Sequence, residues 1–300
     1  MMSVDQAEQL RIVMEDAKTA AECAHSARRN SNCRTIAISS GKGGVGKSSL
    51  ALNLSLALIR QGAGVVLLDA DLGLANIDVM LNTVPRYTLA DVINGERKVK
   101  DIIVRGPLDL KIIPGGSGLF NLANLDRVRR DMIISQLGDL EQEGNYIIID
   151  TGAGLSRNVL SFIAAAEELI LVTTPEPTAL TDAYGMLKVL TEKKMRDTSF
   201  VVVNTTRNLQ QGLRTFDSLN RVAARYLPAM QLSYLGDIRY DPAVSGAVHT
   251  FTPFLINRPH SAASIAVNRI AWRIASERVV EPGRKTGVSG FLSRLKNLLW

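Results

Sequence analysis

Short apolar runs alternate with longer amphipathic segments from about residue 35 to residue 281. The runs are almost continuously apolar, which is typical of strands that are buried on both faces of a parallel sheet. They predict strands at Thr35–Ser39, Val65–Asp69, Leu110–Ile113, Tyr146–Asp150, Leu169–Thr173, Phe200–Asn204 and Leu232–Gly236, the last being the weakest pattern. Helical periodicity predicts helices at Ser49–Arg60, Leu125–Glu143, Thr181–Lys193, Leu213–Leu227 and Ser261–Arg278. The alternation predicts an α/β fold, a doubly wound, mostly parallel sheet with helices on both faces, whose ligand binds at the carboxyl ends of the strands.

A glycine-rich turn, Ser40–Ser49, lies between the first predicted strand and the first predicted helix. Strand, glycine-rich turn and helix in this order predict a P-loop, in which backbone N–H groups surround phosphate oxygens. Lys47 would reach the β- and γ-phosphates and the Ser48 hydroxyl would bind Mg²⁺. A turn without a ligand is the alternative, and the strand and helix on either side disfavour it. The expected nucleotide-binding residues of the loop are Gly41, Lys42, Gly43, Gly44, Val45, Gly46, Lys47, Ser48 and Ser49.

Composition and charge narrow the type of partner and the type of protein. A net charge of +6 and a pI near 9.4 favour an anionic partner without choosing between nucleotide, membrane surface and nucleic acid. The two cysteines, Cys23 and Cys33, form neither a disulfide framework nor a metal-binding motif. No apolar span approaches the ~18 residues of a transmembrane helix, and the first residues do not resemble a signal peptide. We therefore expect a cytoplasmic protein.

Polar side chains follow three predicted strands directly. Asp69 and Asp71 follow the second strand, Asp150 follows the fourth, and Asn204 follows the sixth. Beside a Mg²⁺-triphosphate, one carboxylate can hold metal-bound water and another can orient the attacking water. The alternatives are helix capping for Asp69 or Asp71 and a turn role for Asn204. Glycines follow Asp150 at 152 and 154, as suits a loop whose backbone senses the γ-phosphate.

The segment from Lys42 to Ser48 resembles the deviant Walker A motif of the MinD/ParA ATPases. The resemblance implies slow, regulatory ATP hydrolysis with Mg²⁺ and an ATP-dependent homodimer. It implies catalytic roles for Lys42, Lys47 and Asp71, with Lys42 contacting nucleotide phosphates across the dimer interface and Asp71 positioning the water. It also implies that Ser48, Asp69 and Asp150 serve the metal and that Asn204 contacts the adenine. The alternative for Lys42 is a lysine that is merely exposed in a solvated loop. The sequence departs from the family at Gly152, where MinD usually has a proline.

The N-terminal segment Asp5–Arg11 resembles the DQAxxLR motif of the FlhG (FleN) family of flagellar number regulators. The resemblance implies that the arm binds FlhF, a signal-recognition-type GTPase, and stimulates its hydrolysis. The implied partner-binding residues are Asp5, Gln6, Ala7, Leu10 and Arg11, with Gln6 as the key residue. Helical spacing also puts Ala7, Leu10, Met14 and Ala17 on one face. A helix that packs on its own domain is the alternative.

The C-terminal segment has an apolar stripe beside basic side chains. Phe291, Leu292, Leu295, Leu298 and Leu299 share one helical face, Arg294 and Lys296 lie off it, and Trp300 suits a lipid headgroup boundary. The pattern predicts an interfacial membrane helix and resembles the membrane-targeting sequence of MinD. One such helix would bind weakly and two on a dimer far better. A helix docked on its own domain is the alternative.

These features divide the chain into an arm (1–34), a MinD-like ATPase domain (35–281), a linker (282–289) and an amphipathic membrane-targeting helix (290–300). The resemblance implies an ATP-dependent, dimerising ATPase switch that controls flagellar number and placement. We expect it to be cytoplasmic and to associate reversibly with the anionic inner face of the cell membrane, near the pole. The sequence leaves open whether a flagellar transcriptional activator or a switch-complex protein is a further partner.

Three other functions remain open. A MinD-type regulator of the cell-division site would share the tail but lack the arm. A ParA-type partition ATPase would need a basic DNA-binding face, and no direct DNA binding is expected here. A metabolic transferase or ligase would need a second substrate pocket, for which the sequence shows no residue constellation.

Overall fold

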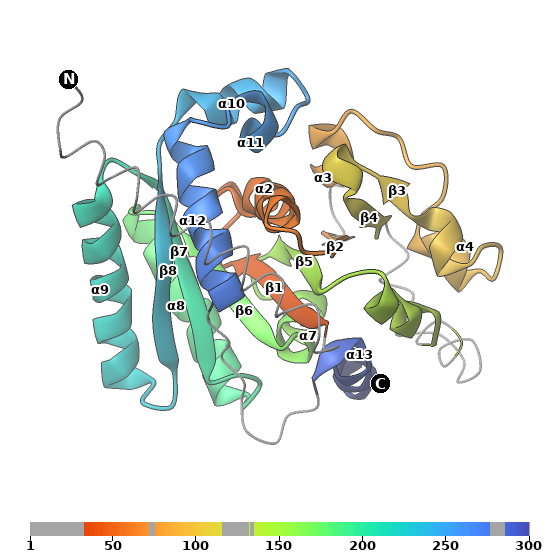
Figure 1. Cartoon of the computed structure of the whole chain (residues 1–300). Helices are drawn as coiled ribbons and strands as arrows, with labels where there is room; N and C mark the ends of the chain where they lie inside the picture. Colours follow the sequence, from red (N-terminus) through yellow and green to blue (C-terminus); the bar gives the residue numbers. More distant parts are fainter. Residues whose placement is uncertain (1–32, 72–75, 116–131, 133–134, 277–285, 300) are drawn as a thin grey trace, which may run out of the picture.

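The computed structural model describes residues 33–71, 76–115, 132, 135–276 and 286–299. Its centre is an eight-stranded sheet in the order β3-β4-β2-β5-β1-β6-β7-β8 (Figure 1). All strand pairs are parallel except β3 with β4, which are antiparallel. The strands are β1 Arg34–Ser40, β2 Val65–Ala70, β3 Val104–Arg105, β4 Lys111–Pro114, β5 Tyr146–Ala153, β6 Glu168–Thr173, β7 Thr198–Thr206 and β8 Gln231–Arg239.

This architecture confirms the predicted fold class. Each of the seven predicted strands overlaps an observed one. The two-residue strand β3 was not predicted, because two residues are too few to give an alternating pattern. The strong burial of both faces explains why the predicted runs are continuously apolar: Ala37 packs on one side of β1, and Ile36 and Ile38 pack on the other.

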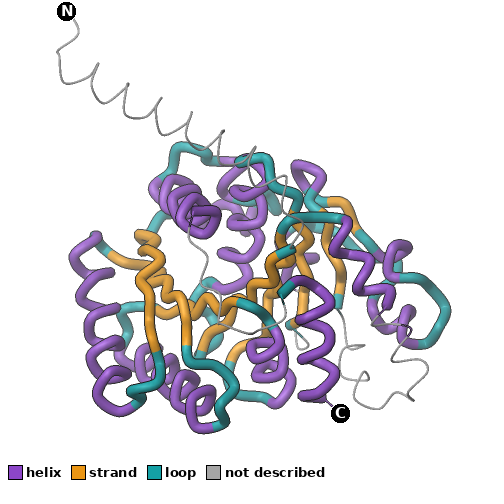
Figure 2. Tube along the Cα trace, turned by 60° about the horizontal axis from the view of Figure 1, so that its bottom comes forward, coloured by secondary structure: helices purple, strands orange, loops and turns teal. Residues whose placement is uncertain are grey.

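Helices cover both faces of the sheet (Figure 2). One apolar core joins the sheet to α2 Lys47–Arg60, α10 Pro242–His249, α11 Phe254–Asn257 and α12 Ala262–Ser276. The core on the other face joins it to α7 Arg157–Ala165, α8 Pro177–Glu192, α9 Leu209–Tyr226 and α13 Gly287–Leu299. Shorter elements are α3 Asn76–Met80, α4 Leu89–Ile93, and the 3₁₀ turns η1 Val99–Ile102, η2 Pro107–Asp109 and η4 Asp139–Gln142. Among the described helices, none is both long and apolar enough to cross a membrane.

The predicted helices at Ser49–Arg60, Thr181–Lys193, Leu213–Leu227 and Ser261–Arg278 correspond to α2, α8, α9 and α12. Most of the predicted helix Leu125–Glu143 lies outside the described residues, and its last residues form η4. Helix α7 was not predicted, although Ser156 caps it by accepting a hydrogen bond from the N–H of Val159 at 3.3 Å. Helix α13 begins at Gly287, three residues before the expected start at residue 290.

Candidate nucleotide-binding site

The glycine-rich loop joins β1 to α2 at the carboxyl edge of the sheet. Gly44 and Gly46 have φ angles of 79° and 89°, a region that favours glycine. Gly41 is required for a different reason, since a Cβ there would lie 2.2 Å from the carbonyl oxygen of Asp182 in α8. Among the described residues no side chain caps the N-terminus of α2 at Gly46, so the first N–H groups of this helix are left for a ligand. The loop therefore has the geometry of an anion-binding helix terminus.

Lys47 lies at the centre of a buried group of charges. Its Nζ is 2.8 Å from Oδ1 of Asp150, 3.4 Å from Oγ of Ser48 and 3.9 Å from Oδ2 of Asp71. The structure thus brings together four residues that the sequence places up to 103 positions apart. A buried ammonium between carboxylates is well placed to exchange these partners for phosphate oxygens.

Asp150 is fully buried at the end of β5. Burial raises the pKa of its carboxyl group, and the nearby Lys47 opposes that rise. Within the described part of the chain, one of its oxygens, Oδ2, has no hydrogen-bond partner. Such an atom is costly unless something binds it, so this orphaned oxygen is suited to a water in the shell of a divalent cation.

Asp69 lies beside Asp150, because the two residues are paired in the register of β2 and β5. Its carboxylate accepts hydrogen bonds from the N–H groups of Asp71 (3.1 Å) and Ile77 (3.4 Å). Burial, followed by the charge of Asp150, raises the pKa of Asp69 to about 7. The bond to Ile77 shows that the capping alternative holds in part, since Ile77 lies in the first turn of α3.

A divalent cation would offset the repulsion between these two carboxylates. Ser48, Asp69 and Asp150 offer only oxygen atoms, the ligand type that Mg²⁺ prefers. In the described residues, no group of three or more His, Cys, Asp or Glu side chains could hold a metal by itself. The residues therefore fit Mg²⁺ only together with nucleotide phosphates and water.

Asp71 faces the same space from the end of β2. A Cβ atom on Gly152 would lie 3.5 Å from Oδ1 of Asp71 and 3.3 Å from Val159 in α7. Gly152 therefore gives the last residues of β5 room to approach Asp71. This placement connects the group around Lys47 with the loop that leads directly into α7.

Lys42 is held away from Lys47. Its Nζ lies 3.2 Å from Oε2 of Glu176 and donates to Oγ1 of Thr178 at 3.0 Å, both at the start of α8. Its side chain is 40% exposed. Sequence reasoning did not identify Glu176 or Thr178, and the available signal was a Glu-Pro-Thr helix start after the end of β6.

Asn204 supports the glycine-rich loop from β7. Its Nδ2 donates to the carbonyl oxygen of Val45 at 2.8 Å, and its Oδ1 accepts from the N–H of Thr205 at 2.9 Å. These are contacts of a residue near the end of a strand that supports a neighbouring loop. The amide has one further donor and acceptor capacity, which leaves the adenine contact as a proposal.

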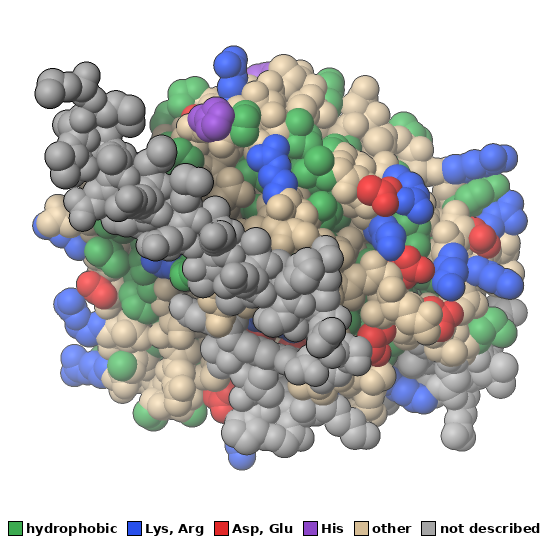
Figure 3. All heavy atoms as spheres, viewed as in Figure 1, with side chains coloured by type: hydrophobic (Ala, Val, Ile, Leu, Met, Phe, Trp, Pro, Cys, Tyr) green, Lys and Arg blue, Asp and Glu red, His purple; other side chains and the backbone are tan. Residues whose placement is uncertain are grey.

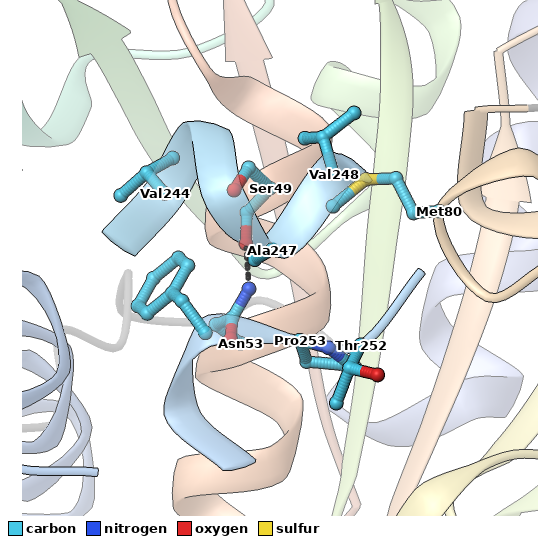
Figure 4. Close-up of a pocket in the computed structure, with 9 residues that line it drawn as sticks. Ser49, Asn53, Met80, Val244, Ala247, Val248, Thr252 and Pro253 are labelled. Atoms are coloured by element: carbon cyan, nitrogen blue, oxygen red, sulfur yellow. Dashed lines mark hydrogen bonds between the residues drawn. The ribbon is translucent and has the colours of Figure 1, made fainter. Parts of the chain in front are cut away.

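A shallow apolar hollow lies behind the P-loop helix, between α2, α10 and α11 (Figure 4). Asn53 spans it, donating to the carbonyl oxygen of Ser49 at 2.8 Å and accepting from the N–H of Leu255 at 3.0 Å. None of Lys47, Asp71 and Asp150 lines this hollow. The hollow is therefore separate from the group around Lys47, and the hydrogen bond of Asn53 to Leu255 joins α2 to α11.

The tail helix α13 is docked on the domain. Phe291, Leu292 and Leu295 are buried, and Leu298 is partly buried against the same core. The ring of Phe291 stacks on Phe162 of α7 with 6.4 Å between centroids. The apolar stripe predicted to face lipid thus faces protein in this structure.

Polar contacts hold α13 in place as well. Arg294 donates from Nε to the carbonyl oxygen of Ala165 at 2.8 Å, and the N–H of Gly287 donates to Glu167 at 2.5 Å. The side chain of Leu299, residue Trp300 and the proposed arm residues Asp5, Gln6, Ala7, Leu10 and Arg11 lie outside the described residues.

Comparisons with known proteins agree with this geometry. The AAA domain family matches residues 33–202. The antiactivator FleN of Pseudomonas aeruginosa is 38% identical over 243 residues, which cover 81% of this chain and 86% of the relative. The flagellum site-determining protein YlxH of Helicobacter pylori is 33% identical over 273 residues, covering 89% and 91%. Among solved structures, the septum site-determining protein MinD of Pyrococcus horikoshii, complexed with Mg-ADP, aligns with a TM-score of 0.61 at 28% identity, covering 80% and 94%.

Proposed function

We propose that this chain, which belongs to the FlhG/FleN group of the MinD/ParA family of P-loop ATPases, is an ATP-driven switch that controls flagellar number and placement. Its ATPase activity follows from the family. One observation carries the proposal: the tail helix α13 packs on α7, and α7 follows β5 after a short loop, with Asp150 and Gly152 of β5 next to Lys47 and Asp71. Nucleotide and tail are thus connected through a single helix.

The residues around the loop have separable roles in this proposal. A bound Mg²⁺-ATP would bring the phosphates and the cation into the space around Lys47. The N–H groups of the loop hold the phosphates, and Lys47 leaves Asp150 to pair with them. Asp150 and Asp69 then keep the water shell of the cation in place, and Asp71 orients the water that attacks the γ-phosphate.

Lys42 gives the switch its dependence on a second copy. Held by Glu176 and Thr178, it cannot reach the phosphates of its own loop without leaving α8. Its exposure allows it to swing outward to the nucleotide of a partner copy, where a cation stabilises transition-state charge. The homodimer therefore forms with ATP, and hydrolysis returns the chain to a monomer.

The tail converts dimerisation into membrane binding. Docked on α7, the stripe containing Phe291, Leu292 and Leu295 cannot contact lipid. ATP binding moves the loop after β5, shifts α7 and releases α13. Two released helices on one dimer then bind an anionic membrane surface, with each helix alone binding weakly.

The arm carries the regulatory output. Its DQAxxLR sequence supports contact with an FlhF-type GTPase, where Gln6 orients a water at the GTPase site. The protein then works in the cytoplasm and at the inner face of the cell membrane, near the pole. A flagellar transcriptional activator or a switch-complex protein is a compatible further partner.

The rival functions receive less support. The FleN and YlxH relatives favour a flagellar role over septum-site selection. On the face shown in Figure 3, Lys and Arg side chains concentrate over α4 and β3 but are interspersed with acidic ones, which does not support a DNA-binding face of the ParA type there.

The function is tested by combining this protein with an FlhF-type GTPase and anionic vesicles. We expect GTP hydrolysis by the partner to be stimulated by the wild type and not by Gln6→Ala, while both hydrolyse ATP equally. We also expect both to sediment with vesicles in ATP and to stay in solution in ADP. Equal GTPase stimulation by wild type and Gln6→Ala would contradict the role of the arm, and equal sedimentation in ADP and ATP would contradict the switch.

A further inference from the structure

Helix α12 presents a partly apolar stripe, Ile265 and Trp272, on its exposed side. Its inner side is buried through Val267 and Ile270. On its outer side, Ile265 is 43% exposed and Trp272 is 47% exposed, with the exposed Arg269 between them. Residues 265 and 272 are two helical turns apart and therefore lie on one face. A large aromatic ring and a β-branched side chain on one open face suit a covering helix.

The described chain begins near the C-terminal end of α12, on the buried side of that helix. Arg34, the first residue of β1, donates from Nη1 to the carbonyl oxygen of Ile274 at 2.6 Å. Ile274 is two residues beyond Trp272 on α12. Arg34 is buried and also binds Glu168 through three hydrogen bonds of 3.2, 2.8 and 2.7 Å, so this position is fixed. Residues 1–32 therefore join the domain next to the C-terminal turn of α12.

The arm has the length and the pattern to lie along this stripe. Leu10 and Ala17 share a predicted helical face and are seven residues apart, the same spacing as Ile265 and Trp272. Seven helical residues cover about 10 Å on either helix. The residues from 18 to 32 can span up to ~50 Å when extended, which is far more than the docking requires.

The charges of the two segments are complementary. Residues 5–22 contain five acidic and two basic residues. Helix α12 contains Arg269 and Arg273 and no acidic residue. Opposite net charges of this kind attract the acidic arm to α12. The contact itself is carried by the apolar face of the arm, because the acidic side chains lie on the other side of the predicted helix.

We propose that the arm docks along the outer face of α12 of the same chain, with Leu10 and Ala17 against Trp272 and Ile265. The tether gives the arm an effective concentration on the order of millimolar, so a weak contact is sufficient. Gln6 lies only about 40° from Leu10 around the predicted helix, so docking also covers Gln6. The arm therefore has to leave α12 before it can bind a GTPase. Only this consequence rests on the proposed function, because the contact needs no partner.

Trp272 is a built-in probe for the contact. The chain has two tryptophans, Trp272 and Trp300, so the full-length Trp300→Phe protein reports on Trp272 alone. In this background, without nucleotide or partner, we expect Leu10→Glu to shift the emission to the red and to raise acrylamide quenching about two-fold, because an aromatic ring loses its cover. Ile12→Glu is the matched control, since it places the same charge on the opposite face of the arm, and it should change neither signal.

Two results would overturn the proposal. Unchanged emission and quenching in Leu10→Glu would show that the arm does not cover Trp272. If acrylamide quenching of Trp272 in the Trp300→Phe protein rises when the protein is diluted, the stripe is covered by a second copy of the chain and not by the arm. A third result separates the two proposals. If Leu10→Glu gives the expected change in Trp272 fluorescence but the wild-type protein does not stimulate the partner GTPase, the proposed function is wrong and the docking of the arm still holds.

Discussion

Shortening Phe162 to alanine should release the tail without changing its sequence. Phe162 lies on α7, is 3% exposed and stacks on Phe291 of α13. A buried Phe→Ala change costs about 3–5 kcal/mol in total. The part that acts on tail docking is at least the aromatic pair, about 0.5–1.5 kcal/mol. At 1.4 kcal/mol per factor of ten, the undocked tail becomes roughly 2- to 10-fold more populated, and more if the cavity also loosens α13.

Co-sedimentation with anionic vesicles in the absence of nucleotide measures this population. We expect more Phe162→Ala than wild-type protein to bind, because the tail keeps its own apolar stripe. Phe254→Ala is the matched control, since Phe254 is equally buried but belongs to the core on the opposite face of the sheet. Binding of folded Phe162→Ala at the wild-type level, or the same gain in Phe254→Ala, would refute the link between α7 and tail release.

Further predictions concern the site itself. Asp71→Ala should keep ATP binding and the ATP dimer but lose hydrolysis, because a water-orienting group acts mainly in the transition state; normal turnover in a phosphate-release assay would exclude the role. Lys42→Ala should lose both the ATP dimer and ATPase activity, and light scattering that still shows a dimer would make Lys42 an ordinary loop residue. The pKa of Asp69 rises from 3.8 to about 7 on folding, so the folded protein keeps a proton that the unfolded chain loses. Without Mg²⁺, the free energy of unfolding should therefore fall between about pH 4 and pH 7 and level off above, and urea unfolding of Asp69→Asn should lack this fall.

The structure also changes what a tail substitution can be expected to do. Leu295 suits a membrane-facing position by sequence, where a glutamate would remove lipid binding and leave the fold intact. In the structure Leu295 is buried against the domain. Leu295→Glu would bury an unpaired charge and undock the tail as well, so it cannot separate the two roles of the stripe. Phe162→Ala avoids this problem because it lies outside the tail.

The P-loop and the parallel sheet could be predicted because each depends on residues that are close together in the sequence. The spacing of the glycines around Lys47 identifies the P-loop, and the continuously apolar strands identify the parallel sheet. Because parallel strands place their carboxyl ends at one edge, the sequence also anticipated that Asp69, Asp71 and Asp150 lie near Lys47. These features need no knowledge of distant contacts.

Contacts between distant segments could not be predicted in the same way. Glu176 holds Lys42 across 134 residues, and no pattern near either residue indicates the pair. The stripe on α13 is another case, because an apolar face that suits a membrane equally suits packing against Phe162. Choosing between lipid and protein requires the neighbouring surface, which only the folded chain provides.

Hydrogen exchange of the α13 amides in the Asp71→Ala variant tests the central claim most directly, since this variant should hold the ATP state without turnover. Mg-ADP and Mg-ATP are compared in the absence of membrane. The account predicts that α13 is protected with ADP and exchanges faster with ATP, because ATP binding shifts α7 and releases the helix. Equal protection of α13 with both nucleotides would contradict a switch that connects the nucleotide to the tail.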